Sequence, residues 1–146
     1  MKRITSVLVV CVMALSMLCG CGNKIKATDT GTVIVTLKSL GYYDESHSEI
    51  GSVDGGELFQ GFLTNNWIFA FYDLDEAACD ETFSHFASSE YVTNKTENGN
   101  YCVIEWKRDE LYMLMIRVDN TILGITGLEA DKEDIQELAK EIGYYN

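Results

Sequence analysis

The chain has 146 residues, a formal net charge of −12, an apolar content of 47% and no proline. This length corresponds to one domain, and the apolar fraction is too high for a wholly disordered protein. The excess of acidic residues argues against a nucleic-acid partner, because phosphate backbones are bound by faces rich in lysine and arginine.

The first twenty residues have the pattern of a secretory signal. A basic pair at residues 2–3 precedes an apolar run over residues 7–18. This run is about 12 residues long, whereas a helix that spans a bilayer needs about 20. The tetrapeptide LCGC at residues 18–21 resembles the lipobox of bacterial lipoproteins. The resemblance implies cleavage before Cys21 and lipidation of its thiol, which would anchor the protein to the outer, extracytoplasmic face of the cell membrane.

Three segments are therefore expected along the chain. Residues 1–20 form the signal peptide, residues 21–30 form the lipidated cysteine with a short polar tether, and residues 31–146 form a single folded domain. Nine flexible residues span on the order of 16 Å, so the domain would lie close to the lipid headgroups.

The first half of the domain gives mixed signals. Residues 32–40 contain β-branched residues that favour a strand, but Val33, Leu37 and Leu40 keep helical spacing, and we favour a helix. Residues 44–61 are mostly polar, contain several glycines and show no period, which predicts a loop or a poorly formed hairpin. Residues 66–72 are apolar at both parities, which is typical of a central strand buried on both faces.

The second half is clearer. Residues 76–89 are expected to form a helix that is capped by Asp73 or Asp75. Strands are expected at 101–107, 111–118 and 121–126, with Asp119 and Asn120 forming a two-residue hairpin turn.

The C-terminal helix is the clearest element of the sequence. Asp131 is its expected N-cap, apolar residues recur with helical spacing from Ile135 to Ile142, and Gly143 ends the helix. The same pattern of lysine, aliphatic residue, glycine and two tyrosines ends both 38–43 and 140–145, which indicates that both helices stop by the same glycine chemistry. The fold class expected from these elements is α+β. It is a two-layer sandwich with a mostly antiparallel sheet of about four strands and two or three helices packed on one face.

Part of this pattern resembles a group of small, uncharacterised lipoproteins from Gram-positive, clostridia-like bacteria. The residues that carry the resemblance are the segment RVDNTIL at 117–123, the helix that ends at Gly143 and Tyr144, and the aromatic strand that leads to an acidic helix start at 69–75. The resemblance implies a short acidic α+β domain behind a lipobox, and it implies no catalytic role.

No catalytic, metal-binding or cofactor-binding pattern stands out. His47 lies between two serines in a loop, where neighbours in sequence rarely reach catalytic geometry, and His85 is expected on a helix surface. The acidic run that begins at Asp73 does not match a calcium loop, because alanine and serine occupy the sixth and twelfth positions. Two of the 23 acidic residues could form a pair for glycoside hydrolysis, but nothing in the sequence selects the pair.

Cys79 and Cys102 are the cysteines that remain beyond residue 21. Both fall on expected core faces, one on a helix and one on a strand. They could form a disulfide worth about 3 kcal/mol by the chain-entropy model, or remain as two buried free thiols.

The hairpin register predicts a second apolar sheet face. If all helices cover the other side, an exposed patch is expected that could contact a partner. Its residues are Met113, Met115, Arg117 and Ile122. The alternative is that the first helix or residues 44–61 cover this side.

We therefore expect a non-enzymatic, membrane-anchored lipoprotein whose extracytoplasmic domain binds a protein or a small ligand, with no nucleic acid and no cofactor. The patch and the loop from His47 to Gly61 are the expected sites. The alternatives are a cell-wall or glycan hydrolase that uses paired carboxylates, and an inhibitor whose acidic surface docks a basic protein.

Overall fold

The computed structural model describes residues 25–146, which form one seven-stranded antiparallel sheet with three α-helices. The helices are α2 (Thr30–Ser39), α3 (Glu76–Ala87) and α4 (Lys132–Glu141), together with the short 3-10 helices η1 (Glu45–His47) and η2 (Glu129–Asp131). The strands are β1 (Ser48–Val53), β2 (Gly56–Phe62), β3 (Ile68–Leu74), β4 (Val92–Asn98), β5 (Tyr101–Arg108), β6 (Leu111–Val118) and β7 (Thr121–Leu128). The expected signal peptide and Cys21 lie outside the described residues. Within residues 25–146, no helix is both long and apolar enough to cross a membrane.

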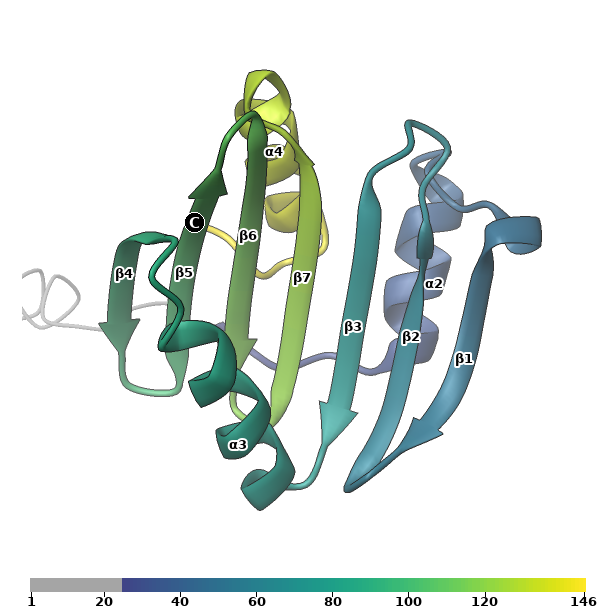
Figure 1. Cartoon of the computed structure of the whole chain (residues 1–146). Coiled ribbons are helices and arrows are strands. Elements are labelled where there is room, and N and C mark those ends of the chain that lie inside the picture. The colour runs from purple at the N-terminus through teal and green to yellow at the C-terminus, as the bar shows by residue number, and fades with distance from the viewer. Residues whose placement is uncertain (1–24) are drawn as a thin grey trace, which may run out of the picture.

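The sheet consists of two meanders joined by one pairing. Its strand order is β1-β2-β3-β7-β6-β5-β4, so every neighbouring pair is sequential except β3 and β7 (Figure 1). These two strands pair antiparallel from Ile68 opposite Thr126 to Asp73 opposite Thr121. As a result β1 and β4 are the two edges of the sheet.

Helices cover both faces of the sheet. Helices α2 and α4 lie behind it in Figure 1, over the larger of two apolar clusters, which includes Phe59, Phe71 and Leu123. Helix α3 lies in front, over a smaller cluster that includes Cys79 and Ile122. The molecule thus has three layers, and only the middle layer is a sheet.

The expectation of about four strands with all helices on one face is wrong, although the fold is α+β. The sheet has seven strands, and α3 packs on the face opposite to α2 and α4. The strands that were missed are β1, β2 and β4. Strand β4 has the sequence VTNKTEN and is exposed over most of its length, so its hydrogen-bonded ladder leaves no apolar alternation in the sequence.

Three further expectations concern the first half of the domain. Residues 32–39 are helical, as favoured, and Leu40 is the C-cap residue of α2. The strand expected at 66–72 is β3, which lies inside the sheet, but its residue Ile68 is half exposed rather than buried. Residues 44–61, expected to be a loop or a poorly formed hairpin, form η1 and most of a regular β1–β2 hairpin.

Two of the three helices begin with a capping aspartate. Asp29 accepts a hydrogen bond from Thr32 N at 2.9 Å, and Asp75 accepts one from Ala78 N at 2.9 Å. Asp131 is the N-cap residue of α4, as expected, but its side chain makes no cap hydrogen bond and accepts instead from Trp67 Nε1 at 3.0 Å. That bond fastens the start of α4 to the loop before β3.

Helices α2 and α4 end in the same motif, as the shared sequence pattern indicates. Gly41 and Gly143 both have positive φ angles, +78° and +92°. The tyrosine after each glycine donates its N–H five residues back, from Tyr42 to Leu37 O at 2.9 Å and from Tyr144 to Ala139 O at 2.8 Å. This is the Schellman arrangement, which satisfies the last carbonyls of a helix.

Tyr144 also ties the two ends of the described chain together. Its ring is fully buried, and its hydroxyl lies 2.5 Å from Thr121 Oγ1 on β7. The same hydroxyl accepts a hydrogen bond from Thr28 N at 3.1 Å. Asn100 Nδ2 donates to Ile25 O at 3.3 Å, so the segment before α2 is held against the body of the domain.

Gly143→Ala should destabilise the domain by about 1 kcal/mol, because an L side chain is strained in the left-handed region even where space is open. A Cβ at position 143 would meet no atom within 4 Å, so steric clash adds nothing to this cost. Gly51→Ala is the matched control, since its surroundings are equally open and its φ is not positive. Urea denaturation should separate the two variants, and equal midpoints would contradict the assignment.

Candidate functional site

The face of the sheet that carries α3 is only partly covered. Residues that face α3 occupy alternate positions on each strand, in rows that cross the sheet. One row contains Phe62, Ile68, Thr126, Met113 and Trp106. Another contains Leu58, Tyr72, Ile122, Arg117 and Cys102. Helix α3 packs over β5–β7 and over the end of β3 that carries Tyr72 and Leu74 (Figure 1). It leaves uncovered the other end of β2 and β3, where Phe62 and Ile68 lie.

The partner face expected at Met113, Met115, Arg117 and Ile122 does not form an open patch. Met115 and Ile122 are 3% and 0% exposed, because Cys79 and Phe83 of α3 pack in the same cluster. Met113 and Arg117 are half-buried. The expectation of an exposed patch there is therefore wrong. Its cause is α3, which covers the side that was assumed to be free of helices.

The exposed apolar surface lies further along the same face. Phe62 and Ile68 are each 51% exposed, and they are directly paired across β2 and β3. Half-buried Ala70 and Leu58 lie on the same face of these strands. A shallow cavity of about 500 Å³ adjoins the pair, with His47, Gln60 and Phe69 also on its wall. Large apolar side chains that gather on one face are typical of an interaction site.

A second cavity, of about 800 Å³, lies beside α3 near the β4–β5 and β6–β7 turns. Its lining combines one cation, Arg117, with the three carboxylates Glu76, Glu97 and Asp119. Arg117 is already paired with Asp80 at 2.5 Å and donates from Nε to Asp119 O at 2.8 Å. The net charge of this lining is negative, which disfavours an anionic ligand.

The cavity does not identify a general acid among its carboxylates. Glu97 has a lowered pKa, because Lys95 donates a hydrogen bond to it, at 2.6 Å. A glycosidase acid needs the opposite, a carboxyl whose pKa is raised by burial or by a like charge. The paired-carboxylate hydrolase remains an expectation of the sequence that no described contact supports.

Cys79 and Cys102 are both buried free thiols in the α3 cluster. Of the two expected alternatives, the structure has the free thiols and not the disulfide. Cys79 Sγ contacts Asp119 O and Cys102 Sγ contacts Glu97 Oε1, each at 3.8 Å. Burial raises the pKa of both thiols, that of Cys102 to about 11. At neutral pH each therefore stays protonated and behaves as a small core residue rather than a nucleophile.

Neither thiol should react with iodoacetamide at pH 7 while the domain is folded, and both should react once it is unfolded. Peptide mapping by mass spectrometry reads each cysteine separately. Reaction of Cys102 should begin only as the pH approaches about 11 or the domain opens. A peptide that links Cys79 to Cys102 in the absence of reductant would contradict the free-thiol state.

His47 belongs to a local turn rather than to a catalytic dyad. Its Nδ1 lies 2.8 Å from Asp44 Oδ2 and 2.9 Å from Ser46 Oγ, and Ser46 Oγ donates to Asp44 Oδ1 at 2.6 Å. Hydrogen bonds from Ser46 and then from His47 lower the pKa of Asp44 to about 2. In a catalytic triad the serine and the aspartate contact opposite ring nitrogens, but here both contact Nδ1. Asp44 therefore caps η1, and Ser46 and His47 are its hydrogen-bond partners within that turn.

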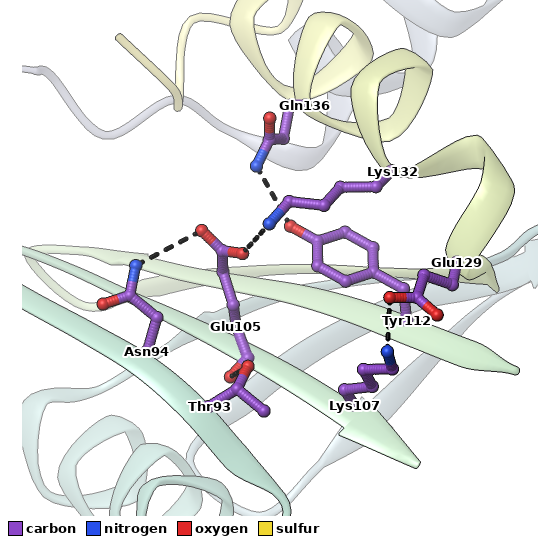
Figure 2. Close-up of polar contacts among 8 residues, drawn as sticks. All are labelled: Thr93, Asn94, Glu105, Lys107, Tyr112, Glu129, Lys132 and Gln136. Atoms are coloured by element: carbon purple, nitrogen blue, oxygen red, sulfur yellow. Dashed lines mark hydrogen bonds and ion pairs between the residues drawn. The ribbon is translucent and has the colours of Figure 1, made fainter. Parts of the chain in front are cut away.

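A buried carboxylate on the opposite face has a structural role. Glu105 on β5 is 7% exposed, and Lys132 Nζ donates to its Oε2 at 2.6 Å (Figure 2). Asn94 Nδ2 reaches its other oxygen at 3.4 Å. Lys132 also lies 5.2 Å from the centre of the Tyr112 ring, whose hydroxyl accepts from Gln136 at 3.2 Å. Both oxygens of Glu105 are thus occupied, and the network fastens α4 to β5 and β6.

Comparison with known proteins bears on the fold alone. No protein-family model matches the chain, and no curated protein matches it. A solved structure described as a GTP binding regulator from Thermotoga maritima resembles it with a TM-score of 0.56 over 80% of this chain and 85% of that chain. The two sequences are 12% identical, so the likeness extends to the arrangement of strands and helices.

Proposed function

We propose that this chain is a bacterial lipoprotein whose extracytoplasmic domain binds another protein at the uncovered part of its sheet. The observation that carries the proposal is the directly paired Phe62 and Ile68, each half exposed at the end of the sheet face that lies beyond the α3 cluster. The occupant is another protein rather than a small ligand, because the surface is a nearly flat strand pair beside a shallow cavity.

The lipobox-like sequence at residues 18–21 and the resemblance to small Gram-positive lipoproteins support the membrane anchor. The described chain begins at Ile25, which is hydrogen-bonded to Asn100. Four residues extend at most about 14 Å, so a lipid on Cys21 would hold the domain next to the headgroups.

The likeness to a GTP binding regulator does not lead us to propose a nucleotide ligand. The larger cavity has three carboxylates and one arginine on its wall, and that arginine is already paired with Asp80. The N-terminus of α3, where a phosphate could bind, is capped by the Asp75 carboxylate.

The anchor is tested by metabolic labelling of cells with a tagged fatty acid. The wild-type chain should take up label and sediment with membranes, and Cys21→Ser should take up none and should accumulate unprocessed. Lys24→Ser is the control for a change near the processing site, and it should be labelled as strongly as wild type. Equal labelling of Cys21→Ser would overturn the lipoprotein assignment.

The docking surface is tested by photo-crosslinking in living cells from a probe at Phe62. We expect one discrete adduct, which should disappear in a chain that also carries Ile68→Asp. A probe at Gln136 on α4 is the control, because that position lies on the opposite face and in the Glu105 network.

Ile68→Asp should lower the free energy of unfolding by about 1–2 kcal/mol, through lost apolar burial and β propensity, which should leave the domain folded, as urea denaturation would check. Loss of the adduct can then be assigned to binding rather than to unfolding. The absence of an adduct at Phe62, or identical adducts at Phe62 and Gln136, would overturn the proposed surface.

A further inference from the structure

The β1 edge of the sheet is open for pairing with a further strand. Strand β1 pairs with β2 through six consecutive residue pairs, and its other side faces no strand. Residues 49–53 are all exposed, and they include the apolar Ile50 and Val53. An edge strand presents unpaired N–H and C=O groups along this side, which can accept the backbone of another chain.

The opposite edge has the features that usually prevent such pairing. In β4 the register shifts between Val92 and Asn94, and Lys95 and Glu97 place both signs of charge along the strand. Irregular register and inward or edge charges discourage the addition of strands. Strand β1 has an unbroken register and a single charged residue, Glu49. The two edges therefore differ, and β1 is the one suited to a partner.

The charge around β1 indicates what kind of segment it accepts. Residues 44–62 contain five acidic residues and no lysine or arginine. These acids are Asp44, Glu45, Glu49, Asp54 and Glu57. Among the described residues, no lysine or arginine forms an ion pair with any of them. A basic strand would neutralise this segment, whereas a second copy of the same acidic hairpin would be repelled.

We infer that an extended, basic segment of the partner protein adds to β1 as an eighth strand of the sheet. This inference rests on the proposed function and names its recognition mode and the chemistry of the partner. Backbone hydrogen bonds along β1 supply the pairing, and alternate side chains of the added strand lie on opposite faces. On one face they lie beside Glu49 and Val53, and on the other beside Ile50.

Such a strand would also bring its protein next to the uncovered face. Phe62 lies on β2, the second strand from the edge, and neighbouring strands are about 4.8 Å apart. The body that carries the added strand can thus contact Phe62 and Ile68 without any rearrangement of the sheet. Edge pairing and face contact are two parts of one interface.

The inference is tested by hydrogen exchange on the full chain with two synthetic peptides as probes. One peptide alternates lysine and valine over eight residues, and the matched peptide has glutamate in place of lysine. We expect the lysine peptide to slow the exchange of the outward β1 amides about tenfold at about ten times its Kd, because about a tenth of the protein is then free. The amides of β4 should not change, and the glutamate peptide should have no effect.

Two controls separate strand pairing from simple charge attraction. A lysine peptide methylated on alternate backbone nitrogens should give no protection, because it cannot complete the ladder. Glu49→Lys combined with Glu57→Lys changes the charge of residues 44–62 from −5 to −1 and should largely abolish the preference between the two peptides. Glu81→Lys combined with Glu97→Lys changes the net charge equally, away from β1, and should leave the preference unchanged.

Three outcomes would overturn the inference. Equal protection by the lysine and glutamate peptides would show that charge is not the basis of recognition. Protection by the methylated peptide would show that strand pairing is not. Protection of β1 in the chain alone, together with a dimeric mass, would mean that a second copy occupies the edge. An adduct from the Phe62 probe with no effect of any peptide on β1 would leave the proposed function standing and make the edge inference wrong.

Discussion

The pairing of β3 with β7 is the constraint on which the rest of the structure depends. It is the one neighbouring pair of strands that is not joined by a turn, and it unites a three-stranded and a four-stranded meander into one sheet. Closing this contact costs chain entropy, because about fifty residues separate the two strands. The aromatic run of β3 offsets that cost, since Phe69 and Phe71 are fully buried against the helices behind the sheet.

The arrangement leaves the coverage of the two faces unequal. Helices α2 and α4 together span the back of the sheet, but α3 alone lies on the front, where it covers β5–β7 and the end of β3 that carries Tyr72 and Leu74. The other end of β2 and β3 stays solvated on the front, and it carries Phe62 and Ile68 at half exposure. A seven-stranded sheet with one helix on a face has more apolar surface than that helix can bury, and this imbalance is the physical origin of the proposed site.

The sequence predicts the helices and strands that are stabilised by burying apolar side chains, and the turns that depend on a particular residue. The strand at 66–72, the Asp119–Asn120 turn and the glycine stops after α2 and α4 all occur where the pattern indicates. Strands β1 and β4 are absent from that prediction because backbone hydrogen bonds hold them at the edges with little apolar burial.

The side of the sheet on which α3 packs cannot be predicted from the periodicity of the strands. Periodicity shows that both faces of β6 and β7 are apolar, but it does not show which helix covers which face, and the partner patch was misplaced for that reason.

The hydrogen bonds of Tyr144 have a mechanical consequence. They join the segment before α2 to β7, in the middle of the sheet, through Thr28 and Thr121. A pull on the chain ahead of residue 25 would load the Ile25–Asn100 contact at the β4–β5 turn and then Tyr144 and the central strand β7, and would reach the β1 edge last. Strands sheared along their length resist force better than an edge strand that is peeled off one bond at a time. Both ends of the described chain are thus held by the same buried side chain, Tyr144. Strand β1, the edge strand that is easiest to peel away, carries none of this force.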